Sequence, residues 1–219
     1  MIKDFGWSSV EFLLRGLMWT AVLSVSTFVC GGFFGLFFAL GRALGPRPVK
    51  FVIAAYIELI QATPLLILLF LAFYGLSFLQ IFLPPLAAAS IALSIYAIAF
   101  LADIWRGCIE AIPKPQWEAA DALGLGRVQQ LRYVVLPQAF RIALGPTVGF
   151  MVQIVKNTSV TALIGFVELT RAGQLLNNMT FQPFQVFITV AIMYFVVCYP
   201  LSWWSEKLKE RRHAGSPAH

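Results

Sequence analysis

Charged residues are scarce in this chain of 219 residues. Asp, Glu, Lys and Arg make up 12% of it, whereas hydrophobic residues make up 59%; soluble domains carry roughly 25% charged residues. This shortage excludes an ordinary soluble domain and predicts an integral membrane protein. The net charge is +6, but the basic residues lie between and after apolar runs rather than in one patch. We therefore expect no nucleic-acid partner.

The residues of common catalytic motifs are also few. Both histidines, His213 and His219, lie in the C-terminal tail, and the three cysteines are widely spaced, with no pair at metal-ligand spacing. The sequence has no HExxH motif, no serine in a G-x-S-x-G setting, and no Gly-Lys pair with which to form an ATPase phosphate loop. We expect no catalytic site, no metal and no cofactor in this chain.

Long apolar runs occupy most of the sequence. A spanning helix needs about 20 mostly apolar residues, and five runs satisfy this, the first being too long for a signal-peptide core. The second run is longer than a straight span requires, so it should be tilted or begin in the membrane interface. Pro64 within it should kink the helix. The expected fold is an all-α integral membrane protein, a single transmembrane domain over residues 1–219 with five transmembrane helices. The runs are Leu17–Leu40, Phe51–Phe82, Pro85–Trp105, Ile142–Val167 and Phe184–Trp204.

Basic residues predict the orientation of these helices, because loops rich in Lys and Arg stay in the cytoplasm. The tail that follows the last run, EKLKERRH from Glu206, carries four of them. Alternation from that end leaves only Lys3, Arg15 and Arg171 outside, with Lys156 inside a span. We expect a cytoplasmic C-terminus and an external N-terminus. The basic residues placed inside are Arg42, Arg47, Lys50, Arg106, Lys114, Arg127, Arg132, Arg141, Lys207, Lys209, Arg211 and Arg212.

A polar insert of about residues 107–140 separates the third and fourth runs and should lie in the cytoplasm. Pro115 is compatible with the first turn of a helix, Glu118 is favoured near its start, and Gly124 is a natural C-terminal stop. A second helix is expected after Gly126, ending at a break near Pro137. The insert is thus a helix-turn-helix. The face of its second helix is expected to hold Val128, Leu131 and Val135.

Two interpretations of the insert remain open on these grounds. Ala119, Ala120 and Ala122 give its first helix a small, smooth surface that another protein can approach closely. Alternatively, the insert is an amphipathic hairpin that lies on the membrane surface.

The insert resembles the cytoplasmic loop of permease subunits of ATP-binding-cassette importers, within their polar amino acid group. That loop carries Glu-Ala-Ala, three residues, Gly, nine residues, Ile, one residue and Leu-Pro. The segments IWRGCIEAIPKPQWEAADALG, LPQAFR, VKNTS and IGFVELTRAGQ are similar to the same group, and the likeness covers roughly Trp7 to Lys209. The matching loop positions are Glu118, Ala119, Ala120, Gly124, Val134, Leu136 and Pro137, with valine in place of isoleucine.

This resemblance implies a type I importer permease and a division of labour. The loop docks as a coupling helix on a separate ATPase subunit, which binds ATP and Mg. The solute path lies between two permease subunits, of the same or a similar chain, in the bacterial cytoplasmic (inner) membrane. An external solute-binding protein delivers polar L-amino acids, as for permeases of the histidine, glutamine, glutamate and arginine type. Two departures, QATP at residues 61–64 and Asn157 after Lys156, bear on which amino acid is carried.

Polar residues inside the apolar runs are candidates for the solute path, since an ionisable group at mid-bilayer is costly without compensation. For Lys156 the alternative is an ion pair with Glu58 or Glu168 that holds helices together. For the polar residues of the second run, the alternative is a proline kink whose freed backbone carbonyl is satisfied by Thr63. Asp103 is expected to pair locally with Arg106. The path candidates are Glu58, Gln61, Thr63, Lys156, Asn157, Ser159 and Glu168.

Two other functions are compatible with a polar membrane bundle. A secondary transporter or channel subunit would also carry polar residues in its spans, but it has no need of the Glu118 to Pro137 pattern. A membrane-embedded enzyme is disfavoured by the missing catalytic motifs.

Overall fold

The computed structural model describes residues 5–214, and every element assigned in that range is a helix. The expectation of an all-α protein is confirmed. The elements are α1 (Trp7–Leu44), α2 (Arg47–Ala62), α3 (Leu65–Phe70), η1 (Leu71–Gly75), α4 (Leu76–Phe78), α5 (Pro85–Glu110), α6 (Lys114–Ala122), α7 (Arg127–Gln129), η2 (Gln130–Val135), α8 (Leu136–Asn157), η3 (Thr158–Ile164), α9 (Leu169–Thr180) and α10 (Pro183–Ala214).

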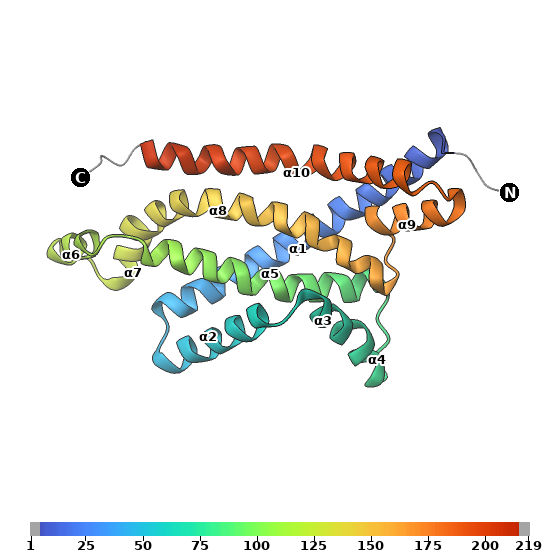
Figure 1. Ribbon diagram of the computed structural model, residues 1–219. Helices are drawn as coiled ribbons and strands as arrows, with labels where there is room; N and C mark the ends of the chain where they lie inside the picture. Colours follow the sequence, from blue (N-terminus) through green and yellow to red (C-terminus); the bar gives the residue numbers. More distant parts are fainter. Residues whose placement is uncertain (1–4, 215–219) are drawn as a thin grey trace.

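The long helices lie side by side and connect the two ends of the bundle (Figure 1). Four described helical segments are long and apolar enough to cross a membrane: α1, α5, the segment Arg127–Ile164 and α10. The bent pair of α2 with Leu65–Phe78, counted as one span, makes a fifth pass. An odd number of passes places the N-terminal and C-terminal ends at opposite ends of the bundle, as Figure 1 shows. The α1–α2 junction and α6 lie at the C-terminal end, which therefore gathers the basic loops.

The kink expected at Pro64 is present, and it is a bend of 102° rather than a tilt. Pro64 has no N–H to continue the helix, and the residue before a proline avoids helical geometry; Thr63 is accordingly extended, with φ −99° and ψ 128°. Its hydroxyl donates to the carbonyl oxygen of Leu59 at 2.7 Å. The threonine thus satisfies a carbonyl that the helix end exposes.

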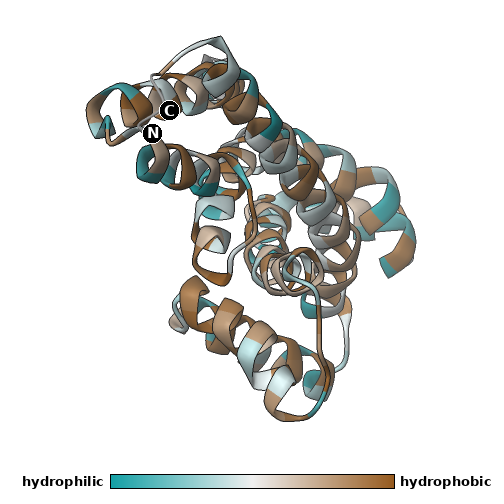
Figure 2. Ribbon diagram, turned by 90° about the vertical axis from the view of Figure 1, so that its right-hand side faces the viewer, coloured by the Kyte–Doolittle hydropathy of each residue, from teal (hydrophilic) through white to brown (hydrophobic). Residues whose placement is uncertain are grey.

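Small residues bring α1 and α5 into close contact. A Cβ atom built on Gly31 would lie 2.5 Å from that of Ala97, and one built on Gly35 would lie 3.2 Å from the Cβ of Leu101. In a membrane, where apolar surface gains little by leaving lipid, such close backbone approach supplies the packing energy. Large apolar side chains point outward instead, Phe33 (60% exposed) and Phe37 (58%) among them. Figure 2 shows hydrophobic residues in every part of the bundle, with hydrophilic residues scattered among them.

The fourth pass differs from its prediction at both ends. No break occurs at Pro137, because the π-helical turn η2 leads directly into α8 and Pro137 falls within the first two residues of α8, where a missing N–H is tolerated. At the other end, α8 stops at Asn157 and continues as the tighter 3₁₀ helix η3, which ends at Ile164 and is followed by Gly165 with φ +84°.

Candidate functional site

Helix α6 is the first helix of the polar insert, and its boundaries follow the predicted signals. Pro115 lies in its first turn. After its last residue, Gly124 adopts φ +74°, a left-handed conformation that glycine tolerates best. The N–H of Gly124 donates to Asp121 O at 2.9 Å, and that of Leu125 donates to Ala120 O at 3.2 Å. These two bonds form a Schellman motif, which ends the helix sharply.

The inner side of α6 is fixed to the rest of the protein by apolar contacts. Trp117 is half-buried against a cluster that includes Ile109 and Val135, and Ala120 is only 2% exposed. Ala120 therefore faces its own protein, so the smooth outer surface consists of Ala119 and Ala122 without it. Leu136 also packs on this cluster, whereas Glu118 and Pro137 are exposed. The expected face of the second helix is wrong in one position, because Val128 is 77% exposed while Leu131 and Val135 are buried.

A buried glutamine, which the sequence did not single out, ties α6 to the next pass. Gln130 is 3% exposed, and its Nε2 donates to the carboxylate of Asp121 and, at 2.7 Å, to the carbonyl oxygen of Leu125. Gln130 begins η2, which runs without interruption into α8. Hydrogen bonds as well as packing therefore connect α6 to the helix that continues as α8. No local pattern marks this glutamine, because its partners are in another helix and in the turn.

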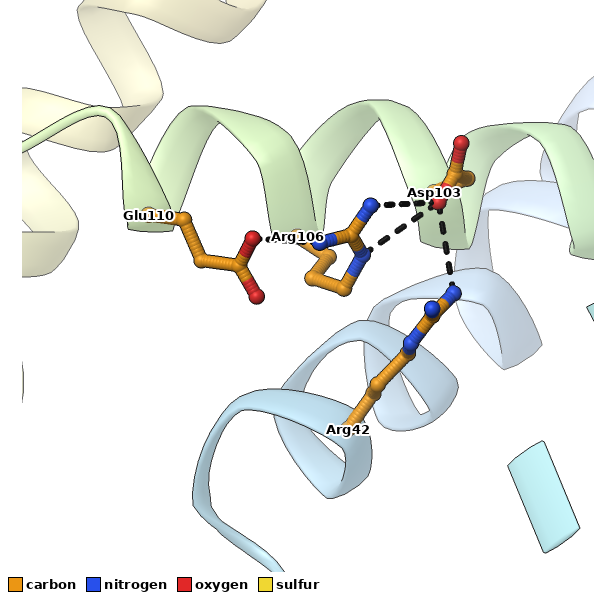
Figure 3. Close-up of polar contacts among 4 residues, drawn as sticks. All are labelled: Arg42, Asp103, Arg106 and Glu110. Atoms are coloured by element: carbon orange, nitrogen blue, oxygen red, sulfur yellow. Dashed lines mark hydrogen bonds and ion pairs between the residues drawn. The ribbon is translucent and has the colours of Figure 1, made fainter. Parts of the chain in front are cut away.

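An ion-pair network joins α1 to α5 beside this insert (Figure 3). Asp103 Oδ1 accepts from Arg106 Nη2 at 2.9 Å, which confirms the expected local pair, and from Arg42 Nη1 at 3.3 Å. Arg106 also pairs with Glu110. The contribution of Arg42 was not predicted, since it lies 61 residues away in sequence.

The solute-path candidates of the second pass are on α2, just before the bend. Glu58 and Gln61 are exposed in the single chain, and Thr63 is occupied by its bond to Leu59. This geometry agrees with the simpler interpretation of a kink satisfied by threonine. The bend lies beside the other irregular region, since α3 packs against η3.

The candidates of the fourth pass lie where α8 becomes η3. Lys156 is exposed in the last turn of α8, where a cation is favoured by the helix dipole. Within residues 5–214 it forms no ion pair with Glu58 or Glu168. Ser159 Oγ donates to Lys156 O at 2.6 Å. Asn157 Oδ1 accepts from Gln153 at 3.1 Å, whereas Asn157 Nδ2 is a buried atom with no partner among the described residues.

Glu168 is fully buried and caps α9. Its carboxylate accepts from the backbone N–H groups of Thr170 at 2.9 Å and Arg171 at 2.8 Å, from the Tyr194 hydroxyl at 2.9 Å and from Thr20 at 3.5 Å. Burial raises the pKa of this carboxyl, and the two N–H bonds oppose that rise. The side chain joins α1, α9 and α10 and reaches no open surface in this conformation.

The comparisons with known proteins agree with this geometry. Residues 31–213 match the family described as binding-protein-dependent transport system inner membrane component, and the chain belongs to that family. The L-cystine transport system permease protein of Bacillus subtilis is 34% identical over 87% of this chain and 82% of its own. The glutamine transport system permease protein of Escherichia coli K12 is 31% identical over 94% of each chain.

Solved structures resemble the chain over nearly its full length. A chain from a crystal structure of an amino acid ABC transporter with histidines has a TM-score of 0.88 and 33% identity, covering 96% of this chain and all of that one. A chain of an inward-facing methionine ABC transporter has a TM-score of 0.81 over 93% and 97%, with 18% identity, so this second likeness shows the fold alone. The protein is thus a multi-pass inner membrane component of the ABC permease class.

Proposed function

We propose that this chain is the permease subunit of an ATP-driven importer of polar L-amino acids. The observation that carries the proposal is the construction of α6. Its outer face presents Glu118 and Ala119, while Trp117 and Gln130 fix its inner face to η2, which continues as α8. An exposed, firmly anchored short helix converts the push of a partner into helix movement. Relatives named for glutamine, cystine and histidine/lysine/arginine/ornithine transport support amino acids as the cargo.

The proposed partners follow from what the chain lacks. With no phosphate loop in its sequence, it depends on a separate ATPase subunit for ATP and Mg, has no enzyme activity of its own, and holds no cofactor. A second permease subunit completes the solute path, and an external solute-binding protein supplies the amino acid. In this arrangement α6 and the C-terminus face the cytoplasm, and the N-terminal end and α9 face outward.

The proposed solute path passes the two irregular regions that contact each other, the bend at Pro64 and the end of α8. Interrupted helices expose backbone groups and polar side chains inside membrane proteins only where they line a cavity or are buried. The buried, unpartnered Nδ2 of Asn157 supports this location. Glu58, Gln61, Lys156 and Ser159 are the further candidates, and the bonds of Glu168 support a structural role for it beside the path.

Reconstitution tests the function directly. Proteoliposomes that hold the complete complex should take up amino acid only with ATP, and liposomes without the ATPase subunit should take up none. Gly124→Arg should leave the protein folded, since a Cβ atom there meets nothing within 4 Å, but should uncouple uptake from hydrolysis. Because Gly124 has φ +74°, Gly124→Ala is the control for the backbone strain alone, which costs about 1 to 2 kcal/mol for a residue with a Cβ atom. ATP-independent uphill uptake would instead identify a secondary transporter, and normal uptake by Gly124→Arg would refute the coupling role of α6.

A further inference from the structure

The basic end of the bundle surrounds a pocket of about 600 Å³. It lies where α2 and α5 diverge. The two helices pack together through Ile57 and Ala102, whereas Lys50 and Glu110, nearer the basic end, line the pocket. The end of α1 and the start of α6 complete its walls. Figure 1 shows these four helix ends at the same end of the molecule.

The pocket carries uncompensated positive charge. Four cations line it, and two of them, Arg42 and Arg106, meet the carboxylates of the network in Figure 3. The other two, Lys50 and Lys114, form no ion pair within the described part of the chain, and both are exposed. With two arginines facing two carboxylates, the two lysines leave the site with an excess of two positive charges that an anion would compensate.

Apolar side chains share the walls with these cations. Phe51, adjacent to Lys50, is 74% exposed and lines the pocket, as does Leu44, which is 45% exposed. The outer face of α2 continues this apolar surface with Val52, which is 65% exposed. A small hydrated anion gains nothing from such surroundings. A molecule with an anionic head and apolar chains is stabilised by both parts of the site.

We propose that this pocket binds an anionic phospholipid of the cytoplasmic leaflet. Its phosphate lies against Lys50 and Lys114, and its acyl chains follow Phe51 and the outer face of α2. Basic pockets between transmembrane helices on the cytoplasmic side suit anionic headgroups for this reason. The lipid proposal rests on the proposed function in one respect only, namely that this end of the bundle faces the cytoplasm. Because Lys114 is the first residue of α6, a bound headgroup also holds the base of that helix at the membrane surface.

Native mass spectrometry of the purified full-length chain tests the proposal. The chain is titrated with phosphatidylglycerol and with phosphatidylcholine of the same acyl chains. The double variant Lys50→Gln/Lys114→Gln should lose on the order of thirtyfold in affinity for phosphatidylglycerol, at about 1 kcal/mol for each lysine, and little for phosphatidylcholine. Arg127→Gln/Arg141→Gln removes the same charge from exposed positions outside the pocket and should bind like the wild type. Equal thermal midpoints for all three proteins show that the fold is retained.

Four results would overturn the proposal. The first is equal affinity for both lipids, and the second is an equal loss in the two double variants. The third is equally tight binding of soluble glycerol phosphate, which would identify a site for free phosphate. The fourth is displacement of phosphatidylglycerol by an added ATPase subunit that shields both lysines from acetylation, which would assign the pocket to a protein contact. ATP-driven uptake is measured separately, so a failure here leaves the proposed function standing.

Discussion

Replacing Gln130 by methionine tests whether α6 is a rigid coupling element. The variant keeps a long side chain in the buried site but loses the bond to the Asp121 carboxylate and the bond to Leu125 O. A hydrogen bond to a charged group contributes about 1.5 to 3 kcal/mol, and a neutral one about 0.5 to 1.5 kcal/mol. Because Asp121 is exposed, the low ends apply, and their sum is about 2 kcal/mol.

This loss acts on the docking of α6 rather than on the whole bundle. A change of about 2 kcal/mol in a local opening equilibrium raises the open population about thirtyfold. Hydrogen–deuterium exchange of residues 114–126 should accelerate by that factor in Gln130→Met, while α1 and α5 exchange as before. In the reconstituted complex, ATP hydrolysis should continue while the amount of amino acid taken up per ATP falls.

Gln129→Met is the matched control. The neighbouring side chain accepts only the exposed N–H of Gly126, at 3.0 Å, within its own turn, and it makes no contact with α6 that resembles those of Gln130. Apart from the N–H of Gly126, which loses its acceptor, the exchange of residues 114–126 and the coupling should stay close to the wild type. If Gln130→Met preserves the protection of residues 114–126 and the uptake per ATP, the argument for a hydrogen-bonded link between α6 and α8 fails.

Three further predictions address the bundle. Gly31→Leu should lower the stability by about 1 to 3 kcal/mol through overpacking against Ala97, measured as the thermal midpoint in detergent. Gly32→Ala is the control and should be tolerated, because a Cβ atom at Gly32 would lie 3.7 Å from its nearest neighbour, a ring atom of Trp105. Equal midpoints of the two variants would contradict the close contact of Gly31 with Ala97. Asp103→Asn should cost about 1 kcal/mol by leaving two arginines side by side, with the loss shrinking in high salt; a salt-independent loss would point to another cause. The pKa of Glu168 is raised in the folded protein, so the folded state keeps the proton of this carboxyl to higher pH than the unfolded state does. The contribution of Glu168 to the free energy of unfolding therefore falls as the pH rises from the ordinary pKa of 4.5 through the pKa of the folded state. The midpoint should decline with pH more steeply in the wild type than in Glu168→Gln, and parallel curves would refute the assignment.

Local signals in the sequence predicted much of the fold. Apolar runs of sufficient length located the five passes, and proline located the bend at residue 64. In the insert, Pro115 and Gly124 predicted the start and end of α6 because a missing N–H and a left-handed conformation are properties of single residues. The same logic failed at Pro137, where the wide turn η2 accommodates the proline. Whether a proline interrupts a helix depends on the helical turn before it as well as on the proline itself.

Only the tertiary structure decided which remote residues meet. Gln130 binds Asp121, Arg42 reaches Asp103, and Glu168 gathers hydroxyls from α1 and α10 instead of the lysine considered for it. Burial of Ala120 and exposure of Val128 likewise depend on how α6 and η2 lie against α5. The sequence determined which segments enter the membrane, because hydropathy and chain stiffness are properties of each segment alone. Helix packing determined the partners, because two residues far apart in sequence become neighbours only when whole helices are placed side by side.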